Sequence, residues 1–120
     1  MVPTPVYKRI LLKLSGESLA GTAKVGIDAH VLRHFAAEIK EVYDLGVQVG
    51  IVLGGGNIFR GLSAEAVHME RVTADHMGML ATILNSLALR DILVQQGIPA
   101  RVMSAVKMDE FAEYYICRNA

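Results

Sequence analysis

Residues 47–61 have the sequence Val-Gln-Val-Gly-Ile-Val-Leu-Gly-Gly-Gly-Asn-Ile-Phe-Arg-Gly, and this stretch decides the predicted fold. Its first seven residues form a short, nearly continuous apolar run, which is typical of a parallel strand buried on both faces. Three glycines follow at residues 54–56, and we call them the glycine turn. Because they lack a Cβ atom, their backbone can take a positive φ and a ligand can approach it closely. Free N–H groups in such a turn suit an anion, above all phosphate.

The glycine turn differs from the two common nucleotide-binding fingerprints. The dinucleotide pattern needs glycine where the sequence has Phe59, and the P-loop needs lysine where it has Leu62. Arg60, four residues after the turn, is instead a planar donor that can bind phosphate oxygens. A tight strand-to-helix turn without a ligand is the structural alternative.

Upstream, residues 6–14 predict the first strand, whose apolar run is interrupted by Lys13 and followed at once by Ser15 and Gly16. Open α/β sheets bind ligands at the carboxyl ends of their strands. We therefore expect Lys13 and the glycine turn to face each other across a gap that holds negatively charged oxygens. The alternative is a lysine that extends along the sheet edge into water.

Between the two strands, residues 19–26 predict a loop, and Asp28 is a suitable N-cap for a helix that ends at a left-handed Gly46. His30 and His34 are four residues apart, but no acidic or cysteine ligand accompanies them. We interpret them as surface histidines.

After the glycine turn, residues 73–96 predict a long helix capped by Thr73, with core methionines at Met77 and Met79. Apolar residues cover it nearly all round and leave only a narrow stripe of small or polar residues, namely Gly78, Thr82, Asn85 and Ser86. Such a helix is buried on two sides. One side can cover the sheet, and the other predicts a homo-oligomer in which a second copy packs against it.

Residues 98–105 predict a third strand and residues 108–118 a third helix. This alternation of strands and helices predicts an α/β fold with a parallel sheet and right-handed crossovers. Three strands are few for two layers of helices, so the chain resembles the first half of a larger domain.

The composition excludes several classes of protein. The 12 basic and 12 acidic residues balance, so the charge favours no nucleic-acid partner. A single cysteine, Cys117, excludes an internal disulfide and a cysteine-based zinc site and indicates a reducing cytoplasm. We expect no signal peptide, no stretch long enough to span a bilayer and no membrane partner.

Three blocks resemble the signatures of bacterial-type uridylate (UMP) kinases, within the amino-acid kinase superfamily. They are residues 6–18 (VYKRILLKLSGES), 50–61 (GIVLGGGNIFRG) and 75–82 (DHMGMLAT). The third block distinguishes them from acetylglutamate, carbamate and aspartate kinases. The resemblance weakens after Val106, since Lys107 stands where proline is expected. It implies a parallel-sheet sandwich of the amino-acid kinase (carbamate kinase-like) type, with residues 1–120 as the N-terminal half of one domain.

The resemblance implies reversible transfer of the γ-phosphoryl group of ATP to UMP, giving UDP and ADP with Mg²⁺, in pyrimidine nucleotide biosynthesis. The implied ATP contacts are Lys13, Leu14, Ser15, Gly16, Gly56 and Arg60, with Lys13 and Arg60 as the catalytic cations. Gly55 and Asp75 would contact UMP, although Asp75 would also suit the first turn of a helix for electrostatic reasons alone. GTP activation would involve Gly21, Thr22, Ala23, Lys24, Val25 and Gly26, and UTP would inhibit.

Family members are cytoplasmic hexamers built from dimers, and their second half supplies the adenine pocket and the acidic residues around Mg²⁺. The 120-residue chain alone is therefore expected to be inactive. Two alternatives stay open. One is a kinase of the same superfamily that acts on a carboxylate or carbamate, and the other is a non-catalytic nucleotide-binding or oligomerisation module.

Overall fold

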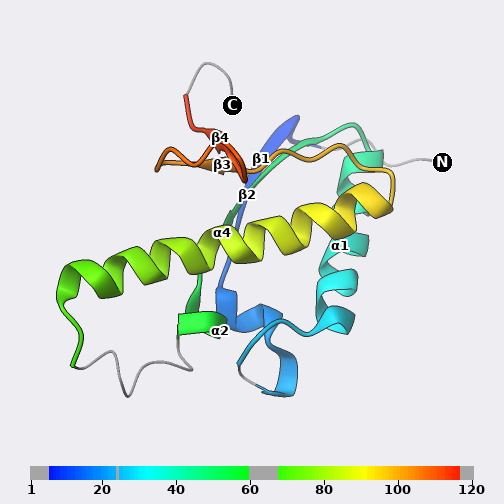
Figure 1. The fold of residues 1–120 in the computed structure, drawn as a ribbon. Coiled ribbons are helices and arrows are strands. Elements are labelled where there is room, and N and C mark those ends of the chain that lie inside the picture. The colour runs from blue at the N-terminus through cyan, green and yellow to red at the C-terminus, as the bar shows by residue number, and fades with distance from the viewer. Residues whose placement is uncertain (1–5, 24, 60–67, 117–120) are drawn as a thin grey trace.

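The computed structural model describes residues 6–23, 25–59 and 68–116 (Figure 1). The elements in chain order are β1 (Arg9–Leu14), the 3₁₀ turns η1 (Gly16–Leu19) and η2 (Gly21–Ala23), α1 (Ala29–Asp44), β2 (Gln48–Leu53), α2 (Gly56–Phe59), α4 (Arg71–Gln95), β3 (Met103–Ser104) and β4 (Glu113–Tyr114). The predicted loop over residues 19–26 thus contains 3₁₀ turns, and its Leu19 is fully buried.

The first half of the chain is a parallel βαβ unit. β1 pairs with β2 from Arg9 opposite Gln48 to Leu14 opposite Leu53. α1 connects them, and the Asp28 carboxylate caps it by accepting from the N–H of His30 at 2.8 Å. Gly46 follows the helix with a φ of +87°. The predicted parallel strands and both ends of this helix are confirmed.

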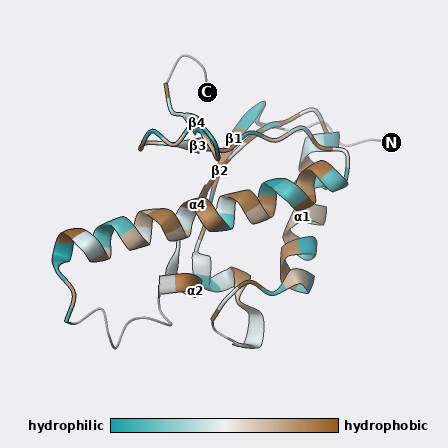
Figure 2. Ribbon diagram, in the orientation of Figure 1, coloured by the Kyte–Doolittle hydropathy of each residue, from teal (hydrophilic) through white to brown (hydrophobic). Residues whose placement is uncertain are grey.

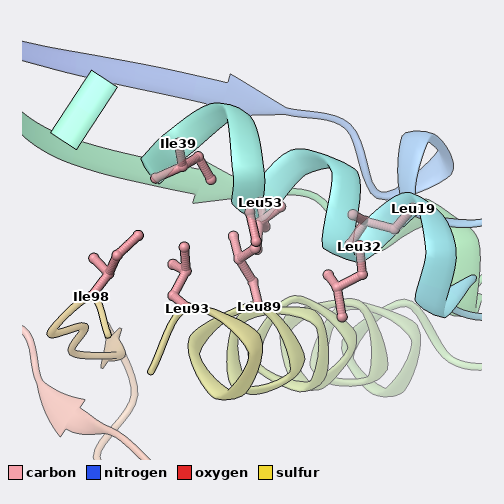
Figure 3. Close-up of a cluster of buried hydrophobic side chains, with 8 residues drawn as sticks. Leu19, Leu32, Ile39, Leu53, Leu89, Leu93 and Ile98 are labelled. Atoms are coloured by element: carbon pink, nitrogen blue, oxygen red, sulfur yellow. The ribbon is translucent and has the colours of Figure 1, made fainter. Parts of the chain in front are cut away.

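The core lies between the inner face of the sheet, α1 and α4 (Figure 3). Leu53 from β2 and Leu32 from α1 meet Leu89 and Leu93 from α4 in one buried cluster. Each of these side chains stabilises the fold by about 1.5–3 kcal/mol when it leaves water. α4 is therefore fixed against the βαβ unit by its second half.

The outer face of the sheet corrects the prediction that the second strand is buried on both faces. Side chains alternate between half-buried and exposed along β1, and Leu11 is 73% exposed and Val52 50% exposed. Because α1 and α4 both pack against the inner face, the outer side chains of the described strands stay in contact with solvent.

α4 differs from its prediction in two respects. It begins at Arg71, after Glu70, so Thr73 lies within the helix and Asp75 lies in its second turn. The stripe of small and polar residues is covered only in part, since Asn85 is fully buried while Gly78, Thr82 and Ser86 are half-buried. Several apolar side chains of the helix are exposed, including the predicted core residue Met79, and they are Val72, Met79, Leu80, Leu84 and Val94. Hydrophobic residues occur along the whole length of α4 (Figure 2).

α4 is also long and apolar enough to cross a membrane by length and composition, so the prediction that no stretch reaches that length was wrong. Core helices of globular proteins pass the same test. Here Asn85 hydrogen-bonds to the backbone of another segment, and Leu89 and Leu93 join the core. These contacts bind the second half of α4 to the core of this fold.

The last described segment corrects two predictions. The third strand is only Met103–Ser104, and it pairs in parallel with β4 in a separate two-stranded sheet rather than with β1 and β2. Residues 108–116 form a turn and β4 instead of a helix. The N–H of Glu113 donates to the Val102 carbonyl at 2.8 Å, and Arg101 forms a two-bond ion pair with the Glu113 carboxylate. These cross-strand bonds fix the extended form.

Candidate functional site

Two turns meet at the carboxyl ends of β1 and β2, where parallel strands place their following loops side by side. The N–H of Gly54 donates to the Leu14 carbonyl at 3.0 Å. A Cβ atom at Gly16 would lie 2.7 Å from the Gly54 carbonyl oxygen and 2.6 Å from Asn57 Oδ1. Residues 15–16 and the glycine turn therefore touch directly, and no gap of the predicted kind separates their backbones.

The glycine turn needs space rather than an unusual backbone angle. Positive φ values in the described chain occur at other glycines, so residues 54–56 do not use the left-handed conformation that glycine allows. A Cβ atom at Gly55 would lie 2.8 Å from Ala81 Cβ and 3.2 Å from the Gly78 carbonyl oxygen. The turn is thus pressed against α4, which accounts for glycine at position 55 whether or not a ligand binds.

The backbone of the turn also presents two free donors. The Gly55 carbonyl accepts from the N–H of Ile58 at 3.1 Å, and the Gly54 N–H is bonded to β1. Within residues 6–23, 25–59 and 68–116, the N–H groups of Gly55 and Gly56 donate to no protein acceptor. Adjacent free N–H groups of this kind suit an anion.

The residues predicted at the end of the first strand surround this turn in different ways. Lys13 is exposed on the outer face of β1, opposite Val52, and forms no ion pair with the described part of the chain. Leu14 contributes its carbonyl. The Ser15 hydroxyl caps η1, because it accepts from the Ser18 N–H at 3.3 Å and lies 2.8 Å from the Ser18 hydroxyl. Ser15 is therefore engaged locally in this structure.

Asp75 lies on the side of α4 that reaches the glycine turn. Gly55 contacts the helix at Gly78 and Thr82, which are three and seven residues beyond Asp75 and so share its face. The Asp75 carboxylate is exposed, and its Oδ1 lies 3.3 Å from Arg71 Nε. Because it is in the second turn of the helix, the alternative role in the first turn does not apply.

Other predicted positions lie at the edge of this region or outside the described residues. Arg60 and Lys24 are outside them. The segment from Gly21 to Gly26 is joined to α2, since the Gly26 N–H donates to the Asn57 carbonyl at 2.9 Å. This contact places one end of the predicted effector loop next to the glycine turn.

Two residues of this region, Asn57 and Asn85, were not predicted from the sequence. Both side chains are fully buried, and their amide groups are hydrogen-bonded to each other. Asn85 also donates to the Gly54 carbonyl at 2.8 Å. A lone amide in an otherwise apolar helix was a usable signal, because a buried amide needs partners.

The free N–H groups of the glycine turn make it a candidate for binding an anion, although the Glu17 side chain lies against Gly56. The described residues contain no group of three His, Cys, Asp or Glu side chains that could hold a metal ion. A hollow lined by Lys8, Arg9, Gly46 and Gln48 lies at the amino ends of β1 and β2. The glycine turn is at the opposite, carboxyl ends of these strands. The free N–H groups therefore make the glycine turn the candidate site.

Comparisons with a family model and with individual known proteins agree on one family. Residues 8–117 match the model of the amino acid kinase family. A uridylate kinase of Dichelobacter nodosus is 54% identical over 118 residues, which are 98% of this chain and 49% of that protein. A uridylate kinase of Methylococcus capsulatus is 56% identical over 116 residues, covering 97% of this chain and 48% of that protein.

Solved structures agree with the sequence matches. A UMP kinase from Bacillus anthracis superposes with a TM-score of 0.84 at 47% identity, over 92% of this chain and 46% of that one. A UMP kinase from Ureaplasma parvum also gives 0.84, at 38% identity over 94% of this chain and 48% of that one. The expected fold class is thereby confirmed, and the chain spans about half the length of the curated relatives it matches.

Proposed function

The chain belongs to the amino acid kinase family, and from this membership we propose that it is the N-terminal half of a uridylate kinase, which transfers the γ-phosphoryl group of ATP to UMP. The observation that carries the proposal is the contact between the two turns, with the free N–H groups of Gly55 and Gly56 at their junction. The names of these four relatives, all uridylate or UMP kinases, support this acceptor over a carboxylate or carbamate.

Phosphoryl transfer depends mainly on positioning and on charge neutralisation. Two phosphate-bearing substrates repel each other, so donors and cations must converge where they meet. In this proposal Leu14, Ser15, Gly16 and Gly56 line the ATP phosphates, and Lys13 and Arg60 supply the positive charge. Gly55 and Asp75 contact UMP.

The orientation of the peptide between Gly54 and Gly55 supports a role for Lys13 in binding phosphate. The Gly55 N–H and Lys13 lie on the same side of the sheet, as follows. Asn85, on α4, holds the Gly54 carbonyl toward the inner side of the sheet. Because a trans peptide is planar, the Gly55 N–H points the opposite way, away from α4. Lys13 is also on the face turned away from α4. We therefore expect the Lys13 ammonium and the Gly55 N–H to approach the same phosphate oxygens.

The remaining expectations belong to the intact protein. Mg²⁺ would neutralise phosphate charge when bound, and the described residues contain no group of three His, Cys, Asp or Glu side chains to hold it. GTP activation through residues 21–26, UTP inhibition, a cytoplasmic location and a hexamer built from dimers are part of the same proposal. The exposed apolar side chains of α4 support self-association.

The test is protection of the intact protein against thermal unfolding, together with ADP release. UMP should raise the melting temperature, whereas acetylglutamate and carbamate should not, because they lack the ribose and base. ADP release from ATP should depend on UMP, and the 120-residue chain alone should show none. Protection by a carboxylate or carbamate substrate instead of UMP would favour the other kinases of the family, and UMP binding without turnover would favour a non-catalytic module.

A further inference from the structure

We propose that Asn57 and Asn85 form a positioning pair that sets the orientation of the glycine turn, an inference that rests on the function proposed above. Neither residue is one of the expected nucleotide contacts. Asn57 lies in α2, directly after the turn, and Asn85 lies in the middle of α4. The pair therefore joins two elements that are far apart in the sequence.

The two side chains use all of their N–H donors on each other and on two backbone carbonyls. Asn57 Nδ2 donates to Asn85 Oδ1 at 3.0 Å, and Asn85 Nδ2 donates to Asn57 Oδ1 at 2.7 Å. The remaining N–H of Asn57 goes to the Gly26 carbonyl at 2.9 Å, and that of Asn85 goes to the Gly54 carbonyl at 2.8 Å. Both side chains are fully buried, and such a completely paired polar group specifies one geometry where apolar side chains would allow several.

Each carbonyl that the pair holds belongs to a segment of the candidate site. The bond from Asn85 fixes the peptide plane between Gly54 and Gly55, and a planar trans peptide then directs the Gly55 N–H away from α4. Asn57 holds Gly26 twice, through its side chain and through its carbonyl, which accepts from the Gly26 N–H at 2.9 Å. The pair thus ties the glycine turn, α4 and the end of the Gly21 to Gly26 segment together.

The central variant is Asn85→Asp in the intact protein. It keeps the shape of the side chain but places an oxygen where the NH₂ group donates to Gly54 and Asn57. Burial raises the pKa of the new carboxyl group, and its protonated form has one O–H that can restore one of the two donated bonds. We expect UMP-dependent turnover at pH 8 to fall at least about tenfold below wild type, as one donor of a preorganised anion site is misdirected. The deficit should shrink as the pH is lowered toward 6.

Ser86→Ala is the matched control, because it removes a hydrogen bond of the neighbouring residue to the Thr82 carbonyl on the same helix. It should stay within twofold of wild type and show no altered pH profile. The double variant Asn57→Leu/Asn85→Leu replaces both amides with apolar groups of similar size. It leaves no unpaired side-chain amide, but it removes the donors to the Gly26 and Gly54 carbonyls. It should remain folded and still lose turnover.

Amide hydrogen exchange provides a readout that does not depend on activity. Loss of the pair should speed exchange at the Gly26 and Gly54 N–H groups in Asn85→Asp and in the double variant, but not in Ser86→Ala. Unchanged exchange in both variants would overturn the pair. Faster exchange with wild-type kcat and KM would show that the pair does not position the site. If the wild-type protein shows no UMP-dependent turnover, the proposed function is wrong. In that case the exchange measurement alone tests whether the pair holds the turn.

Discussion

A methyl group at position 55 would meet α4, not open space, because it would come within 2.8 Å of Ala81 Cβ. The requirement for glycine at this position therefore has a structural cause that is independent of any nucleotide. Gly78, on the facing helix, is the natural comparison, because a Cβ atom added there would meet nothing within 4 Å.

We expect Gly55→Ala to lower the free energy of unfolding by about 1–3 kcal/mol, because the added methyl forces the turn and α4 apart. Gly78→Ala should leave it unchanged or raise it by up to about 1 kcal/mol, since alanine favours a helix. Urea unfolding of the intact protein measures both. Equal midpoints for the two variants would contradict the tight contact between turn and helix.

Lys13 gives a test of chemistry rather than of stability. Because its side chain is exposed, Lys13→Ala should change the melting temperature little. The proposed kinase function predicts a fall in kcat of about 100- to 1,000-fold, as for removal of one preorganised charge-stabilising group. Lys8→Ala, an exposed lysine before the same strand, is the control in the ADP-release assay. Equal UMP-dependent turnover in the two variants would contradict the catalytic role proposed for Lys13.

The sequence predicted the anion site only in part, and the reason differs between residues. Gly55 and Gly56 could be identified because consecutive glycines after an apolar strand are a local signal. Asn57 and Asn85 could not be joined from the sequence, because their contact spans 28 positions. The Ser15 cap on η1 was also missed, since a hydroxyl suits a local cap and a ligand equally well.

Among the helices, both ends of an element were predicted correctly where residues at those ends cap it. α1 has a capping Asp28 and a left-handed Gly46, so both ends were predictable. Residues 108–118 have apolar residues at helical spacing but no such end signals. In the described part, residues 108–116, Glu113 and Tyr115 are held instead by β-type bonds to Val102 and Ser104. Periodicity in a short segment is weaker evidence than tertiary pairing.

The ion pair between Arg101 and Glu113 predicts how the second sheet responds to pH. Hydrogen bonds from the Arg101 guanidinium lower the pKa of the Glu113 carboxyl below its ordinary value. A lowered pKa in the folded state means that the pair stabilises the sheet above the ordinary pKa and that this stabilisation is lost as pH falls through the lowered value. The pair is exposed, so the effect is local.

We therefore expect hydrogen-exchange protection of the Tyr115 N–H, which is bonded to the Ser104 carbonyl, to fall as the pH drops below about 4. Glu113→Gln should remove this pH dependence, whereas Glu110→Gln, at an exposed neighbouring position, should retain it. A Glu113→Gln protein with the wild-type profile would show that the ion pair does not hold the sheet.

The whole molecule is elongated, with extents of 57 × 36 × 25 Å. Its radius of gyration is 15.6 Å, compared with about 14 Å for a compact domain of this length. α4 runs across the βαβ unit and its first turns extend past β2 (Figure 1). The alternation of strands and helices sufficed to predict the α/β class. It did not predict that the outer face of the sheet is exposed, because that depends on the face against which the helices pack.

The exposed apolar side chains of α4 make self-association testable. Leu84 is 49% exposed, and Leu80, one turn earlier, is 57% exposed. We expect Leu84→Glu to shift the intact protein to smaller species in sedimentation velocity, because a charge would be buried at the contact between copies. Ala37→Glu, on the exposed side of α1, is the control. An unchanged distribution for Leu84→Glu would place the contact between copies elsewhere.

The parallel pairing of β1 with β2 has a consequence for how the protein is made. Paired residues such as Arg9 and Gln48 are 39 positions apart. At about 5–20 residues per second, the ribosome delivers the second strand roughly 2–8 s after the first. The apolar first strand thus emerges without its hydrogen-bonding neighbour, and nascent chains stalled before and after β2 has left the exit tunnel should differ sharply in protease resistance.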